Sequence, residues 1–168
     1  MPRTPIQGLA FLLGFAIALW LAPRAVLTEP LSDPEASRLE AQLYEQVNAV
    51  RAQYHLLALA RQPEIDGVAR AHSGDMAARG YMAHESPEGA NPLDRLARGH
   101  VDGFSMAAEN IGMTNKSTPA GEIVAAWMRS PVHRVNLLAP AFNTTGIGVA
   151  RAHDGSWIAT QLYLSYPR

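Results

Sequence analysis

Cysteine is absent from this chain of 168 residues, and its absence removes several kinds of chemistry at once. Without thiols the protein has no disulfides, no thiolate nucleophile and no cysteine-based zinc site. Any metal site must therefore be built from His, Asp or Glu side chains.

An excess of charge of one sign is also missing. The 14 Lys and Arg residues nearly balance the 15 Asp and Glu residues, and no basic stripe indicates a nucleic-acid partner. Charged residues make up 17% of the chain and hydrophobic residues 48%, which is typical of a globular protein and not of a disordered one. The length fits a single domain.

One long hydrophobic run is present, at the N-terminus. Arg3 precedes an apolar segment of about 15 residues, 8–22, which suits the core of a signal peptide and is short of the roughly 20 residues that cross a bilayer. No clean small-x-small triplet follows, so residues 1–25 are predicted to be either a signal peptide or an uncleaved membrane anchor. Both alternatives place the domain in an extracellular, periplasmic or cell-envelope location. Residues 26–36 are predicted to be a linker and residues 37–168 the domain.

Helices are predicted for the first part of the domain. Apolar residues recur every three or four positions from residue 34 or 37 to about 55, and a second helix opens at Pro63 and ends at Gly80. A short helix is predicted over 92–99, a longer one over 119–129, and Ser130-Pro131 favours a new helix start directly afterwards.

Strands are predicted mainly at the C-terminus. Residues 143–152 and 157–166 alternate with the period of a strand and flank an Asp-Gly turn, which indicates a hairpin. Residues 106–113 predict one earlier strand.

Three short motifs place His or Glu among apolar residues: HESPEG at 84–89, AEN at 108–110 and WMRSPVHRVN at 127–136. His84 is expected in a loop after the second helix, and His133 three residues past a helix cap. Glu109 has apolar neighbours on both sides, so its carboxylate is expected to be partly buried and to need a partner.

These motifs resemble the CAP superfamily, the cysteine-rich secretory, antigen 5 and pathogenesis-related proteins, in its bacterial, cysteine-free branch. The resemblance covers roughly residues 39–166. It implies an α+β fold, a three-layer α-β-α sandwich with a central antiparallel sheet. It also implies a binding cleft lined by His84, Glu109 and His133. The residues that the resemblance assigns to their support are Asn110, Ser130, Arg134 and Asn136.

The chain departs from the family pattern at one acid. The family has a second Glu near the end of the helix that bears Trp127, where this chain has Ser130. Glu122 and Asp94 are possible substitutes, although both have the setting of surface charges. His72 is expected to be a packing residue of the second helix.

Two imidazoles and a carboxylate suit Zn²⁺ and leave a position for water. We therefore expect an exported binding module in which His84, Glu109 and His133 bind a divalent metal such as zinc, a small or lipid-like ligand, or both. A membrane contact is expected only through residues 1–25, and no nucleic acid is expected.

Two other functions stay open at this point. In a metal-assisted hydrolase acting on peptides or the cell wall, Glu109 or Glu85 would take the proton of a metal-bound water. The chain has neither an H-E-x-x-H nor a G-x-S-x-G motif, which favours binding over catalysis. In a purely structural envelope domain, the histidines would only pack.

Overall fold

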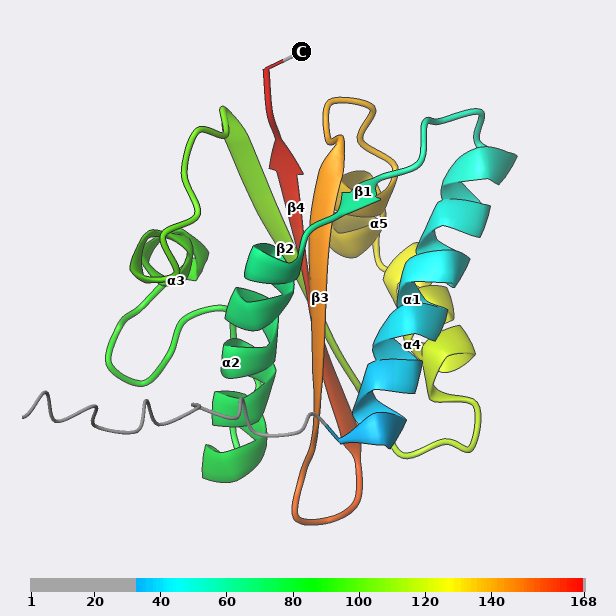
Figure 1. Cartoon of the computed structure of the whole chain (residues 1–168). Coiled ribbons are helices and arrows are strands. Elements are labelled where there is room, and N and C mark those ends of the chain that lie inside the picture. Colours follow the sequence, from blue (N-terminus) through cyan, green and yellow to red (C-terminus); the bar gives the residue numbers. More distant parts are fainter. Residues whose placement is uncertain (1–32, 168) are drawn as a thin grey trace, which may run out of the picture. The chain divides into compact units, whose positions relative to one another are not determined.

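A four-stranded sheet lies between two layers of helices in the computed structural model, which describes residues 33–167 (Figure 1). The strands stand in the order β1 (Ala60–Arg61), β3 (Thr144–Arg151), β4 (Trp157–Ser165) and β2 (Met106–Thr114). All neighbours pair antiparallel except β1, which runs parallel to β3 over two residues. The predicted hairpin is the β3–β4 pair. The predicted α+β sandwich is confirmed, with this short parallel edge as an addition.

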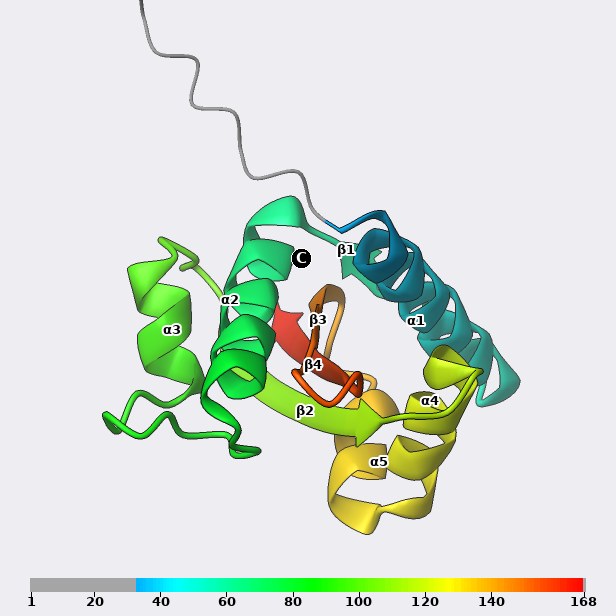
Figure 2. The same cartoon turned by 90° about the horizontal axis from the view of Figure 1, so that it is seen from below.

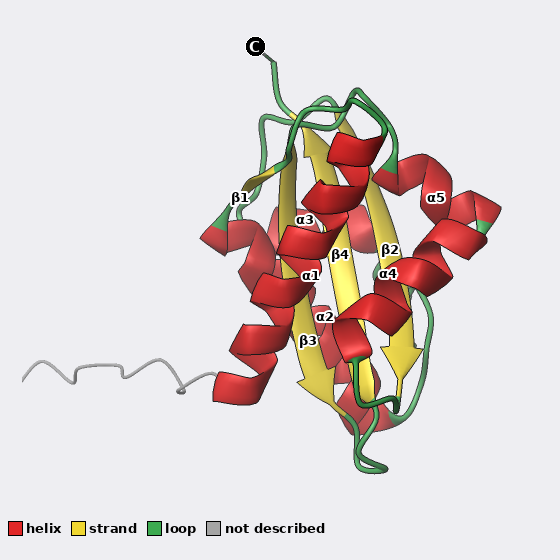
Figure 3. Cartoon of the chain, turned by 90° about the vertical axis from the view of Figure 1, so that its right-hand side faces the viewer, coloured by secondary structure: helices red, strands yellow, loops and turns green. Residues whose placement is uncertain are grey.

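Five helices in the described part of the chain form the outer layers. On one face of the sheet lie α2 (Pro63–Arg79) and α3 (Pro92–Arg98), as Figure 2 shows. The other face is covered by α1 (Pro34–Gln53), α4 (Pro119–Arg129) and α5 (Pro131–Leu137), which stand in front of the strands in Figure 3. Each helix has a proline in its first turn, where the missing N–H costs nothing.

The start of α1 shortens the predicted linker. Asp33 caps this helix, because its carboxylate accepts a hydrogen bond from the backbone N–H of Glu35 at 2.9 Å. Residues 34–36 of the predicted linker 26–36 therefore belong to the helix, and Ala36 is already buried. The first helix thus begins three residues before the predicted start of the domain at residue 37.

The predicted leader, residues 1–25, lies outside the described residues. Within residues 33–167, no helix combines the length and the apolar character that a bilayer span requires.

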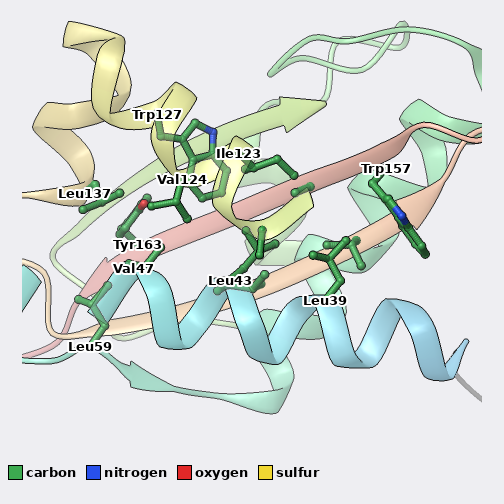
Figure 4. Packing of buried hydrophobic residues seen from close by; sticks show 14 of the residues in the cluster. Leu39, Leu43, Val47, Leu59, Ile123, Val124, Trp127, Leu137, Trp157 and Tyr163 are labelled. Carbon is green, nitrogen blue, oxygen red and sulfur yellow. The ribbon is translucent and has the colours of Figure 1, made fainter. Parts of the chain in front are cut away.

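The larger part of the hydrophobic core lies between the sheet and the α1–α4 layer (Figure 4). The side chains of Leu39, Leu43 and Val47 are buried at helical spacing along α1. They pack in one cluster with Trp127 of α4 and Tyr163 of β4. The indole N–H of Trp127 donates to the carbonyl of Ile111 at 2.9 Å, which fixes α4 against β2.

On the opposite face, α2 packs against β3 at backbone distance. A Cβ at Gly146 would lie 2.3 Å from the carbonyl carbon of Ile65, and one at Gly148 would lie 2.0 Å from the backbone nitrogen of Arg70. Glycine is required at both positions because the helix leaves no room for a side chain. The Ser73 hydroxyl adds a hydrogen bond of 2.9 Å to the carbonyl of Gly148.

Two acidic side chains complete the edge of β3 beyond its short pairing with β1. The backbone N–H of Ile147 donates to Asp66 at 2.8 Å, and that of Val149 donates to Glu40 at 3.3 Å. Both carboxylates are buried. They satisfy backbone donors that would otherwise lack a partner inside the protein.

Two arginines balance these buried acids. Arg70 pairs with Glu40 at 2.6 Å, and Arg61 pairs with Asp66 at 2.9 Å and with Glu40 at 2.9 Å. The four side chains connect α1, β1 and α2 at one edge of the sheet.

We expect Gly148→Ala to lower the free energy of unfolding by about 3 kcal/mol, because its Cβ would press on the backbone of α2. The matched control is Gly74→Ala, on α2 itself, where an added Cβ would meet nothing within 4 Å. That change should leave the stability unchanged or raise it by up to about 1 kcal/mol. Urea unfolding of both variants measures the difference, and equal stabilities would contradict this account of the interface.

Candidate functional site

Glu109 of β2 is the centre of a polar cluster beneath α2 and α3. Its side chain is only 2% exposed, and both of its oxygens have partners. Oε1 accepts a hydrogen bond from Nδ1 of His84 at 2.8 Å, and Oε2 accepts one from Nη2 of Arg95 at 2.7 Å. Nε2 of His72 lies 3.9 Å from Oε1. The expected partner of the buried carboxylate is therefore a set of three basic side chains.

Arg95 is a residue of the candidate site that the motifs did not indicate. It stands on α3, and its Nη1 donates to the carbonyls of His84 at 2.9 Å and Ala90 at 2.8 Å. Its Nε is the one buried side-chain nitrogen or oxygen of residues 33–167 that has no hydrogen-bond partner. The need of Glu109 for a buried cation was the available signal. Arg95 thus connects the loop of His84 to β2.

The two substitutes considered for the missing second acid lie elsewhere. Asp94 caps α3, where its carboxylate accepts from the backbone N–H of Asn91 at 3.0 Å. Glu122 stands in the first turn of α4. Neither side chain contacts Glu109.

The His84 side chain is 50% exposed, and Glu109 determines its tautomer. A carboxylate only accepts hydrogen bonds, so Nδ1 of His84 carries the proton that it donates. In the neutral ring, Nε2 then has a free lone pair. This is the nitrogen that can accept a proton or bind a metal.

His133 stands in the first turns of α5, and its ring forms no hydrogen bond within the described chain. Burial lowers the pKa of His133, and the charge of the nearby His84 lowers it further. The ring is therefore neutral at neutral pH, with a lone pair available. His72 also has a pKa lowered mainly by burial, against the opposing effect of Glu109. Its Nε2 bonds to the carbonyl of Ala83 at 3.0 Å, so this residue packs as predicted but also lies beside the site.

Two of the predicted supporting residues brace the backbone of the site. The amide of Asn110 donates to the carbonyl of His133 at 3.0 Å, and its oxygen accepts from Asn136 at 3.0 Å. Asn136 also donates to the carbonyl of Glu109 at 3.4 Å. The two amides together connect β2 to α5.

The other two predicted supporting residues have different surroundings. Ser130 separates α4 from α5, but its hydroxyl makes no capping bond to α5. Arg134 lies against Tyr54, with Nη2 3.3 Å from the phenol oxygen and the guanidinium 5.7 Å from the ring centre.

The predicted metal ligands differ in whether they have an atom free to coordinate a metal ion. In the described part of the chain, no group of three or more His, Cys, Asp or Glu side chains is arranged to hold a metal ion. Both oxygens of Glu109 already accept hydrogen bonds from basic groups, whereas His84 and His133 each retain a ring nitrogen with no partner. The two imidazoles are thus the part of the predicted ligand set with open coordinating atoms.

The motifs and the sandwich fold match one family of known proteins. Residues 44–163 match the family model of CAP, the cysteine-rich secretory protein family. The chain belongs to the CAP family. The family predicted from the three motifs is confirmed.

Bacterial proteins are among the relatives of this CAP chain. It is 38% identical over 128 residues to the uncharacterized protein YkwD of Bacillus subtilis, a match that covers 76% of this chain and 48% of YkwD. It is 31% identical to an extracellular protein with an SCP domain from Bacillus anthracis, with a TM-score of 0.67 over 82% of this chain and 45% of that one. The chain therefore spans about half the length of these two relatives.

A more distant structure has the same fold at domain size. An outer surface protein from Borrelia burgdorferi has a TM-score of 0.71 and 18% identity, covering 79% of this chain and 96% of that one.

The buried His72 should make the stability of the CAP domain depend on pH. Because burial lowers its pKa in the folded state, the unfolded state binds a proton first as the pH falls through about 6.5. Stability should then decrease with falling pH between about 6.5 and the folded pKa, by at most about 1.4 kcal/mol per pH unit for this group.

Urea unfolding between pH 7.5 and 5 measures this slope. His72→Gln, which keeps an N–H donor, should reduce the slope, while His153→Gln at an exposed turn should not. An unchanged slope in His72→Gln would show that this histidine does not titrate with folding.

Proposed function

We propose that this chain is an exported CAP module in which the imidazoles of His84 and His133 bind a divalent cation, with Zn²⁺ as the cofactor tested. Glu109 orients His84 in this proposal and does not itself bind the metal. The supporting observation is the 2.8 Å hydrogen bond from Nδ1 of His84 to Glu109.

The hydrogen bond has the arrangement that carboxylates adopt behind metal-binding histidines. Such a carboxylate holds the proton on one ring nitrogen and turns the other toward the metal. Here it directs the lone pair to Nε2 on a half-exposed side chain. Arg95 holds the second oxygen of the same carboxylate, so the orientation of Glu109 is itself fixed.

The state of His133 also fits metal binding. An imidazole coordinates a metal only when it is neutral, and the lowered pKa of His133 keeps it neutral at physiological pH. Two imidazoles leave further coordination positions to water or to a small ligand. Bound there, the metal would act as a Lewis acid. The small or lipid-like ligand that the family resemblance implies would bind at these open coordination positions.

Export of the protein rests on two observations. Arg3 and the apolar segment 8–22 have the form of a secretory leader. The 31% identical relative from Bacillus anthracis is an extracellular protein.

The hydrolase alternative has less support. Its general base would be Glu109 or Glu85, and the two oxygens of Glu109 are engaged by His84 and Arg95. Glu85 is exposed, and it is the remaining candidate for the general base of a hydrolase. Turnover of peptide or cell-wall substrates that disappears in Glu85→Gln would favour the hydrolase.

We expect isothermal titration of the protein with Zn²⁺ at pH 7.5 to show binding that the double change His84→Ala, His133→Ala abolishes. Glu109→Gln should weaken the affinity by about ten- to a hundredfold, because it alters the orientation of His84 without removing a coordinating atom. Binding should also weaken toward pH 5, because protons compete with a metal ion for imidazole nitrogens.

The matched control is His153→Ala, which removes an exposed histidine and should leave Zn²⁺ affinity unchanged. If Glu109→Gln abolished the heat of Zn²⁺ binding while the double His variant still bound, the metal ligands would be residues other than His84 and His133. A wild-type protein that binds no Zn²⁺ would leave the structural envelope domain as the better description.

A further inference from the structure

A separate pocket of about 520 Å³ lies where α4, α5 and the segment after them meet. Its walls are apolar, with Met128, Pro131, Val135 and Leu138 among them, and Arg129 and Arg134 also line it. None of its lining residues is acidic, and His84, Glu109 and His133 are not among them.

The pocket uses one face of α5. Pro131, Arg134, Val135 and Leu138 follow one another at intervals of three, one and three residues, which places them on the same side of the helix. Val135 is 64% exposed, although it is a large apolar side chain. His133 falls outside this spacing.

The two arginines of the pocket have no acidic partner. The side chain of Arg129 forms no hydrogen bond or ion pair within residues 33–167. The guanidinium of Arg134 forms its one hydrogen bond there with the neutral side chain of Tyr54. Elsewhere in the domain, Arg70, Arg79 and Arg151 each pair with a carboxylate. The positive charge at the pocket is therefore available to a ligand.

We infer that this pocket binds a small organic anion with an apolar body, whose charged group is held by Arg129 and Arg134. The volume is within the range of about 300–1,000 Å³ that is typical of small-molecule sites. Apolar walls with a few polar groups that fix orientation are the usual design of such sites. A guanidinium can hold a carboxylate, sulfonate or phosphate through two parallel hydrogen bonds. The inference does not depend on metal binding at His84 and His133.

Two fluorescent probes that differ in one group test the inference on the full chain. The anion 8-anilinonaphthalene-1-sulfonate (ANS) and the neutral N-phenyl-1-naphthylamine share an apolar body, and only ANS carries a sulfonate. ANS should bind more tightly. The double change Arg129→Gln, Arg134→Gln should weaken ANS about three- to tenfold and leave the neutral probe unchanged. Val135→Asp should weaken both probes.

Matched controls stand on α3, away from the pocket. Arg98→Gln removes an exposed arginine, and Leu93→Asp places a charge at an exposed apolar position, and neither should alter binding. Melting temperatures within about 2 °C of wild type exclude unfolding as the source of a change. Residues 1–32 are the same in every variant, so probe bound there cancels from the comparison.

Three outcomes would overturn the inference. They are the absence of ANS binding, equal affinity for the two probes, and ANS binding that the arginine and Val135 variants leave intact. Binding of the protein to anionic lipid vesicles that depends on Arg129 and Arg134, without ANS binding, would assign this surface to a membrane instead.

Discussion

The buried carboxylates on the edge of β3 constrain the placement of the other layers. Asp66 and Glu40 accept the backbone N–H groups of Ile147 and Val149, so a helix from each face of the sheet is connected to the same strand. An unpaired buried N–H or carboxylate would be costly, and these contacts satisfy both kinds of group. Since Asp66 and His72 stand on the same helix, the contact that aligns α2 along β3 also determines where His72 meets β2.

The charge balance around Glu109 bears on which cations the proposed site could bind. One carboxylate and one guanidinium, Glu109 and Arg95, neutralise each other, and the histidines in their neutral form add no charge. A cation would therefore gain little from a negative potential and would depend on coordination by imidazole. Under the proposed function, such a site would favour zinc and related borderline metals over Ca²⁺ or Mg²⁺, which prefer several oxygen ligands.

Local patterns predicted most of the fold and part of the site. Prolines and apolar spacing located the helices, and the alternation around the Asp-Gly turn located the β3–β4 hairpin. The strand β1 was not predicted, because two residues carry no periodicity and pair only with a distant strand. Arg95 was missed for the same reason, since its role depends on a contact with β2 across 14 positions of sequence. The motif at Ser130 suggested a side-chain cap, but the Ser130 hydroxyl makes no capping hydrogen bond to α5.

The contact of α2 with Gly146 and Gly148 also has a consequence for motion. Backbone packed on backbone has no side chains that could change rotamer, so α2 and β3 move as one rigid body. His72 and Glu109 belong to that body through α2 and the sheet. The two histidines with open nitrogens lie outside that body, in the loop after α2 and in α5. Arg95 and Asn110 hold the backbone carbonyls of these two residues in place.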